Sequence, residues 1–321
     1  MLDLTLKQLT SLSFRLYADN PVIRRFGTSP MIADPSVLTP DRSPDGKWHL
    51  FAHALWGVYR FESEDGIDFR RSQKIVPRAM RPDIKRIGDT YYLFYERLQP
   101  LLGRAVGLMG GTWRSEIFAV TTKDLKTYSE PFPVLRFDRT FERVGRKGYS
   151  LSNPFLFPTE EGYRLYYSAG LTYIPDCKFT EPTYICLAES DRPDCGYRKR
   201  EMPIIEPDPQ SKLFNLCCGC LKVYRLKDCY IGIQNGLYRD GKNSKSAIQL
   251  LKSEDGIHFT FVKTLLEPQA INGSNWMKQF VYASHLVQYG NKLRLYFNAR
   301  NTAFILTGRE HIGFAEAEVT D

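Results

Sequence analysis

The sequence predicts an all-β fold, a five-bladed β-propeller built from four-stranded antiparallel blades. Helical periodicity is scarce, and short runs rich in Tyr, Phe, Val, Ile and Leu alternate with Gly, Asp, Asn and Pro, which is typical of many short strands. A polar turn recurs along the chain, and a strand that ends in a polar residue recurs upstream of it. Internal repeats of this kind indicate the blades of a propeller.

The recurring turn reads SEDGIDF at 63–69 and SEDGIHF at 253–259, with weaker copies at 122–128 and 189–197. Each copy leads into an aromatic residue that opens a new strand. The upstream strands align without gaps: WHLFAH (48–53), YYLFYE (91–96), YRLYYS (163–168), YRLKDCYIGIQ (224–234) and LRLYFN (293–298). Each follows a short apolar strand and a turn, so the predicted unit of four strands occurs five times. A β-sandwich with coincidental turns is the alternative.

The last repeat is incomplete, because the chain ends after HIGFAEAEVTD without the turn and the fourth strand. The segment FRLYADNPVI (14–23) resembles the outer strands at 69–77 and 259–268. We expect this segment to complete the last blade and close the ring, which would remove exposed sheet edges. Residues 1–321 would then form a single propeller domain.

The formal net charge of +8 favours anionic partners such as an acidic glycan, a phosphorylated sugar or phosphate. The charges are scattered, so a mildly basic solvated surface is the alternative. We predict no nucleic-acid partner, because no module or aromatic-basic strand of that class is present. The oligomeric state is left open.

We expect a cytoplasmic protein with no membrane span. No run of about 18 apolar residues occurs, and the N-terminus lacks the features of a signal peptide. All seven cysteines lie between Cys177 and Cys229, and an odd, clustered set does not fit a secreted disulfide framework. The cluster Cys217, Cys218 and Cys220 has no second pair for a zinc site, so free thiols and no metal are predicted.

A site is predicted at one mouth of the central channel, where antiparallel pairing brings the start of each first strand beside the end of each second strand. The second strands all end in polar residues, namely His53, Glu96, Ser168, Gln234 and Asn298. The first strands contribute Asp34, Asp83, Asn153, Lys222 and His285. Nearby aromatic residues are Trp56, Tyr95, Tyr149, Trp276 and Tyr282. Acids, amides and aromatic faces together indicate a carbohydrate site, with inserts at 97–114, 136–150 and 171–184 forming its rim.

These motifs resemble the five-bladed propeller glycoside hydrolases, especially glycoside hydrolase family 43 and its relatives in families 32, 62, 68 and 130. The matching stretches are Ala33-Asp34-Pro35-Ser36-Val37, Arg81-Pro82-Asp83-Ile84 followed by GDTYYLFYE, and Asn153-Pro154-Phe155-Leu156-Phe157 followed by EEGYRLYYS. The resemblance covers nearly the whole chain. It implies that Asp34 is the general base or the nucleophile.

Two parts of the family pattern differ in this chain. The acid that the resemblance places in the third blade is Asn153 here, and Asp83 is the candidate to compensate. The general acid of the family opens the fourth blade, where this chain has Cys218-Gly219-Cys220 and no Glu. Because a poor leaving group needs a proton donor, we assign that role to Glu96, with Glu142 and Glu310 in reserve.

Three functions follow from these observations. The first is cleavage or transfer of a glycosidic bond in an oligosaccharide or polysaccharide. The second is a phosphorylase or glycosyl transferase acting on a glycosyl phosphate, with the anion held by Arg81, Lys222, His285 and Arg300. The third is a glycan-binding propeller without catalysis. No cofactor is required, although the resemblance also implies a channel ion, often calcium, near His285.

Overall fold

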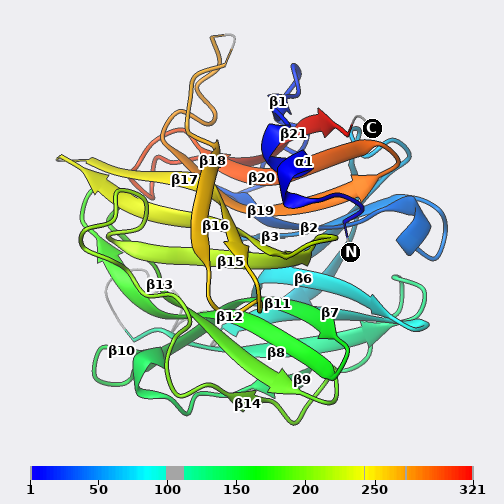
Figure 1. Cartoon of the computed structure of the whole chain (residues 1–321), viewed down its shortest axis with the longest axis horizontal. Helices are drawn as coiled ribbons and strands as arrows, with labels where there is room; N and C mark the ends of the chain where they lie inside the picture. The colour runs from blue at the N-terminus through cyan, green and yellow to red at the C-terminus, as the bar shows by residue number, and fades with distance from the viewer. Residues whose placement is uncertain (1, 99–111, 242, 272, 320–321) are drawn as a thin grey trace.

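The computed structural model describes residues 2–98, 112–241, 243–271 and 273–319. Within these residues the strands form five four-stranded antiparallel blades, as the sequence predicts (Figure 1). The innermost strand of each blade contacts the innermost strand of the next, and the fifth contacts the first. Blades 2 and 3 are also joined by a short parallel pairing of Tyr149 and Ser150 with Arg114 and Ser115.

The blades follow one another along the chain. Blade 1 contains β2 (Ile32–Leu38), β3 (Trp48–Ala54), β4 (Gly57–Ser63) and β5 (Arg70–Pro77). Blade 2 contains β6 (Ala79–Ile87), β7 (Thr90–Leu98), β8 (Arg114–Thr122) and β9 (Phe132–Leu135). Blade 3 contains β11 (Gly148–Thr159), β12 (Gly162–Ile174), β13 (Phe179–Ser190) and β14 (Arg198–Lys199). Blade 4 contains β15 (Cys217–Arg225), β16 (Tyr230–Asp240), β17 (Asn243–Ser253) and β18 (Thr260–Leu266). Blade 5 contains β19 (Phe280–Tyr289), β20 (Lys292–Arg300), β21 (Glu310–Glu318) and β1 (Arg15–Leu16).

The N-terminal segment supplies the outer strand of blade 5. Arg15 and Leu16 of β1 pair antiparallel with Glu316 and Ala315, and Ile23 forms a further bridge with Ile312. In Figure 1 the blue N-terminal segment lies beside the red β21. The helix α1 (Leu6–Ser11) precedes β1 and buries Leu9 in the apolar core shared by blades 4 and 5. Both ends of the chain therefore contribute to one sheet, as the sequence predicts for 14–23.

The recurring turn connects the third and fourth strands of blades 1 and 4 in the same way. In blade 1 the Ser63 hydroxyl accepts the Gly66 N–H, and the Asp65 carboxylate accepts the N–H groups of Ile67 and Asp68, at 2.8–2.9 Å. The turn at 253–259 repeats these three bonds through Ser253 and Asp255 at the same distances. Short polar side chains that bond the backbone ahead of them favour such turns.

A β-bulge interrupts the innermost strand of every blade near the same mouth of the channel. The pairing slips between Ala33 and Ser36 in β2 and at the corresponding points in β6, β11, β15 and β19. In four of the five blades the bulge contains a positive φ angle, which is 55° at Asp34, 53° at Arg81, 47° at Asn153 and 65° at Gly219. A bulge redirects the side chain that it carries, and here it brings one residue per blade to a common mouth.

The structure also bears on the cysteines, on groups of metal-ligating side chains and on membrane-spanning helices. All seven cysteines are free thiols, and six of them are buried. No group of three or more metal-ligating side chains occurs in the described part of the chain. Within the same residues, no helix has both the length and the apolar character needed to cross a membrane.

Three further small elements do not alter this architecture. The 3₁₀ turns Pro40–Arg42 and Thr140–Glu142 and the short strand β10 (Arg143–Val144) lie in connections between larger strands. β10 pairs antiparallel with the start of β11, so the end of the insert predicted at 136–150 forms a short hairpin. Of the insert predicted at 97–114, residues 99–111 lie outside the described residues.

Candidate functional site

A pocket with a volume of about 60 Å³ lies at the mouth where the bulges converge. A cavity of this volume holds several waters or a small ligand group. It brings together eight residues that the sequence analysis named: Asp34, His53, Arg81, Asn153, Asn298 and Arg300, the aromatic Tyr282 and the reserve acid Glu310. It also contains polar residues that the sequence did not assign to this site, among them Glu181, Cys220 and Asn235. We refer to it as the site pocket.

Asp34 is held in the site pocket by two neighbouring blades. Its Oδ2 lies 3.2 Å from Nδ1 of His53, and its backbone N–H donates to Oδ1 of Asn298 at 3.1 Å. Burial alone raises the pKa of Asp34, but the hydrogen bond and charge of His53 and the nearby Arg81 and Lys222 lower it below its ordinary value. Asp34 is therefore a fixed, ionised carboxylate at neutral pH.

Arg81 and Glu96 form a buried ion pair that positions the arginine. Nη1 of Arg81 donates to Oε2 of Glu96, and Glu96 is fully buried. Arg81 lines the site pocket, whereas Glu96 lies behind it and is not among the lining residues. Because Glu96 is bound by the guanidinium group and does not reach the pocket, this geometry disfavours Glu96 as a proton donor to a substrate.

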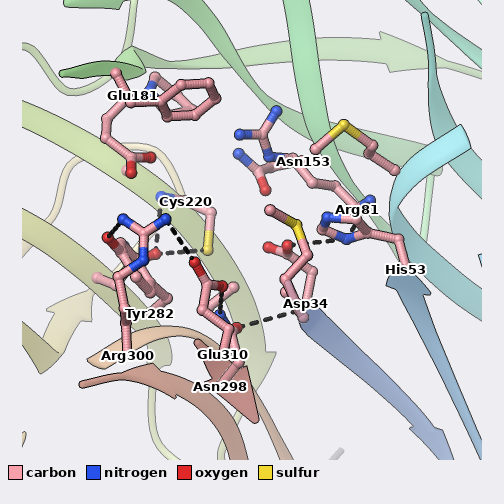
Figure 2. A pocket seen from close by; sticks show the side chains of 18 of the residues that line it. Asp34, His53, Arg81, Asn153, Glu181, Cys220, Tyr282, Asn298, Arg300 and Glu310 are labelled. Atoms are coloured by element: carbon pink, nitrogen blue, oxygen red, sulfur yellow. Dashed lines mark hydrogen bonds and ion pairs between the residues drawn. The ribbon is translucent and has the colours of Figure 1, made fainter. Parts of the chain in front are cut away.

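Glu181 contributes a second carboxylate to the site pocket from β13. Figure 2 shows its side chain pointing into the pocket from a different side than Asp34. It has no hydrogen-bond or ion-pair partner among the described residues. Burial raises the pKa of Glu181 to about 7, with further contributions from the charges of Glu310 and Asp34, and Arg81 and Arg300 only partly oppose the increase. Glu181 is therefore partly protonated near neutral pH, whereas Asp34 is ionised.

Glu310 is a third carboxylate in the site pocket, and it is fully engaged. Its Oε1 lies 3.0 Å from Nη2 of Arg300, and its Oε2 accepts from Nδ2 of Asn298 at 3.0 Å (Figure 2). Arg300 also donates to the Tyr282 hydroxyl at 3.4 Å. Asn298 thus connects Asp34 to Glu310, and the contacts with Arg300 and Asn298 occupy both carboxylate oxygens of Glu310.

Blades 3 and 4 place only part of the predicted ring in the site pocket. Asn153 lines it, while Ser168 lies behind Asn153 and donates to the Gly219 carbonyl at 2.7 Å. Gln234 is buried and donates to the Cys218 carbonyl at 2.9 Å, and its neighbour Asn235 lines the pocket instead. Adjacent residues of a strand face opposite sides of the sheet. A prediction that is wrong by one residue therefore selects Gln234, which faces away from the pocket, instead of Asn235, which lines it.

Trp56 lies at the turn between β3 and β4 and is 40% exposed. Its Nε1 donates to the Thr28 hydroxyl at 3.2 Å, and it does not line the site pocket. Large exposed apolar side chains also occur near the end of β12, at Tyr173, and in the connection between β20 and β21, at Phe304 and Leu306. These turns stand at the same mouth, where exposed aromatic faces suit contact with a sugar ring.

Asp83 lies deeper in the channel and joins three innermost strands. Its Oδ1 accepts from the Ser36 hydroxyl at 3.3 Å, and its Oδ2 accepts from the Leu156 N–H at 2.9 Å. Nζ of Lys85 lies 3.3 Å from Oδ1. The carboxylate is fully buried and does not line the site pocket. These contacts give Asp83 a stabilising place in the channel wall.

Lys222 and His285 also lie along the channel below the site pocket. Nζ of Lys222 donates to the Pro35 carbonyl at 3.1 Å, and Nδ1 of His285 accepts the Val37 N–H at 2.7 Å. Burial together with the charges of Lys222, Lys85 and Arg42 lowers the pKa of His285 well below its ordinary value. Asp83 lies beside Lys85 in the same stretch of channel, and the channel ion predicted near His285 stays a prediction.

Replacement of Asp83 by Asn is expected to lower the free energy of unfolding by about 1.5–3 kcal/mol, the usual contribution of hydrogen bonds to a charged group. The amide would keep the shape of the side chain but lose the charge that faces Lys85. Urea denaturation measures the change, with the exposed Asp89→Asn as the control. A stability equal to that of the control would contradict this role.

Sequence reasoning missed Glu181 and gave Glu310 only a reserve role. Glu181 lies in the insert 171–184 that was predicted to rim the site, so its segment was found although its side chain was not. Glu142, the other reserve, lies elsewhere, where it is buried against Nζ of Lys199 at 2.6 Å and accepts from the Tyr167 hydroxyl at 3.0 Å. The sequence signal that could have identified Glu181 was its position in an insert predicted to form the rim of the site.

Solved structures confirm the resemblance at the level of the fold. No protein-family model and no curated protein matches the chain. The catalytic domain of a Coprinopsis cinerea GH62 α-L-arabinofuranosidase is 14% identical, with 95% of this chain and 97% of that chain covered and a TM-score of 0.65. A structure described with the GH130 mannoside phosphorylases is 14% identical, with 98% and 96% covered and a TM-score of 0.63.

A third similar structure is an N-acetylgalactosamine deacetylase from F. plautii in complex with blood group B trisaccharide. It is 13% identical, with 96% of this chain and 95% of that chain covered and a TM-score of 0.66. The three proteins differ in their reactions, so the shared propeller identifies a fold used by carbohydrate-active enzymes. The reaction of this chain has to be argued from its own site.

Proposed function

We propose that this chain cleaves or transfers a glycosidic bond, with Asp34 as general base or nucleophile and Glu181 as general acid. The observation that supports this most is the convergence of two carboxylates with opposite environments on one pocket. The pKa of Asp34 is lowered and that of Glu181 is raised to about 7. Carboxylates whose pKa values are separated by their surroundings are the usual acid and base of glycoside hydrolysis.

The chemistry assigns a separate task to each group. Protonated Glu181 would donate its proton to the glycosidic oxygen as the bond to the sugar breaks. Ionised Asp34 would remove a proton from the attacking water, or would attack the sugar carbon itself. His53 and Asn298 hold Asp34 from its side chain and its backbone, so they are positioning residues. Arg81 and Arg300 are held by Glu96 and Glu310 and remain available for hydrogen bonds to substrate hydroxyl groups.

The substrate class proposed is an oligosaccharide or polysaccharide whose end enters the site pocket. The pocket is small, whereas Trp56, Tyr173 and Phe304 expose aromatic faces on three turns at its mouth. A terminal sugar would occupy the pocket while further units contact the aromatic rim. We place the protein in the cytoplasm, a proposal supported by seven unpaired cysteines, because thiols persist in reducing compartments.

A panel of aryl glycosides and natural oligosaccharides, assayed with and without inorganic phosphate, tests the proposed reaction. Hydrolysis without phosphate supports the assignment made here. A strict requirement for phosphate would instead favour phosphorolysis, the second candidate, for which the guanidinium groups of Arg81 and Arg300 in the pocket are the favourable observation. Binding of glycans without turnover in either condition would favour the non-catalytic alternative.

A further inference from the structure

A second pocket adjoins the ends of β20 and β21, the strands that carry Arg300 and Glu310 into the site pocket. It has a volume of about 510 Å³ and is lined by Arg24, Arg25, Trp276, Asn301, Arg309 and His311, together with Asn275. Asn301, Arg309 and His311 are the chain neighbours of Arg300 and Glu310. Because successive residues of a strand face opposite sides, the two pockets share the wall formed by these strand ends. We refer to the second one as the basic pocket.

The charge of the basic pocket is not neutralised. Its lining contains three arginines and, within the described residues, no carboxylate. Arg309 donates to the backbone carbonyls of Leu306 and Gly308 at 3.1 and 2.8 Å, and Arg25 donates to that of Ser29 at 3.4 Å. None of the three arginines forms an ion pair with a described residue. In contrast, both arginines of the site pocket are paired with glutamates.

A buried tryptophan also lines the basic pocket. Trp276 is only 6% exposed, and its indole Nε1–H has no hydrogen-bond partner among the described residues. Its ring is fixed by stacking on Phe297, with centroids 5.8 Å apart. The Nε1 atom itself is shielded, so the indole gives the basic pocket a fixed wall, and the exposed guanidinium groups of Arg24 and Arg25 are the donors open to an incoming anion.

His311 adds a further donor in a defined tautomer. Its Nδ1 accepts the backbone N–H of Arg25 at 3.0 Å, so the proton of the neutral ring lies on Nε2. Burial and the charges of Arg24 and Arg25 lower the pKa of His311 to about 4. The reciprocal backbone bonds between Ile23 and Ile312, at 3.0 and 2.9 Å, hold the arginine segment beside this histidine.

We propose that the basic pocket binds an oxyanion, a phosphate or a carboxylate, carried by the glycan whose end occupies the site pocket. The anion would accept from the guanidinium groups. This inference rests on the proposed glycosidic-bond chemistry for the identity of the carrier, whereas the anion site itself stands on the lining residues. It names the substrate as an acidic or phosphorylated saccharide.

Binding of four probes, measured by calorimetry at low ionic strength, tests the anion site. The probes are inorganic phosphate, glucuronate, a galacturonate trimer and the methyl ester of that trimer. We expect the trimer to bind at least tenfold more tightly than its uncharged ester, in line with the strength of charge-assisted hydrogen bonds. Phosphate and glucuronate as free ions show which of the two oxyanions the pocket prefers.

The double variant Arg24→Gln/Arg309→Gln is expected to weaken binding of the preferred anion at least tenfold. The control is Arg70→Gln/Arg198→Gln, which removes two exposed arginines from the outer strands β5 and β14 and should leave binding unchanged. NMR gives an independent reading, because a bound anion raises the pKa of the His311 imidazole. Equal affinities in both double variants, or a His311 pKa that does not respond to the anion, would overturn the proposal.

The same measurements in an Asp34→Asn background separate the two proposals. Anion binding that persists in a protein without turnover supports the basic pocket whatever the reaction is. If the protein turns over glycosides but shows no preference for the charged trimer, the anion site is refuted and the proposed reaction still stands.

Discussion

Replacement of Asp34 by Asn is expected to lower kcat for glycoside turnover by at least about 10³-fold, within the range that positioned acid or base groups contribute. The amide has no charge to accept a proton or attack a sugar carbon. It is nearly isosteric, and the backbone bond to Asn298 does not involve the replaced atoms. The affinity for a glycan ligand should therefore change little. Steady-state kinetics combined with calorimetric binding measures both quantities.

The matched control for this variant is Asp89→Asn at an exposed turn, which alters charge equally and lies outside the site pocket. Its kcat should equal that of the unmodified protein. An Asp34→Asn protein that keeps kcat within tenfold of this control would refute the role of Asp34. Loss of glycan binding together with activity would indicate that Asp34 mainly organises the pocket.

Replacement of Glu181 by Gln is expected to reduce turnover of natural glycosides by about 10²–10⁴-fold, the usual contribution of a general acid. Aryl glycosides with good leaving groups should retain activity within tenfold, because their departure needs little protonation. The exposed Glu160→Gln serves as the control. Equal losses with both kinds of substrate would show that Glu181 is not the proton donor.

The pH profile gives a second test of Glu181. The acid must be protonated, so kcat/KM for natural glycosides should fall as the pH rises above about 7, the pKa of Glu181. Asp34 must be ionised and its pKa lies below its ordinary value, so activity should persist down to about pH 4. In Glu181→Gln the alkaline decrease should disappear. A decrease that remains at the same pH would assign it to another group.

The repeat predicted most of the fold because its turns have local causes. Ser63 and Asp65 bond the backbone within a few residues, and Ser253 and Asp255 do the same. Such contacts are encoded in short stretches of sequence, so strand order could be counted from them. The pairing of the N-terminal segment with β21 was predicted for the same reason, since its pattern matches the other outer strands.

The site was less predictable because side-chain direction depends on single-residue shifts and on partners far along the chain. The bulge at Cys217–Cys220 places Asn235 rather than Gln234 in the site pocket. Glu96 ends its strand at the predicted mouth, but Arg81 occupies the space in front of it. Glu181 lies near the start of β13, in the hairpin that this strand forms with β12. None of these facts is expressed in the pattern of polar and apolar residues.

The bulge in blade 4 has a consequence for how such a site can change over time. Gly219 has a φ of 65°, and a Cβ there would lie 1.9 Å from the Asn235 carbonyl oxygen, so no side chain can be added at that position. A proton donor cannot be acquired there by point mutation, whereas the β12–β13 hairpin tolerates insertion and exchange. The proposed base therefore lies on an innermost strand, β2, whereas the proposed acid lies on the β12–β13 hairpin. We expect that the proton donor of this site can be changed by altering that one hairpin while the innermost strands stay the same.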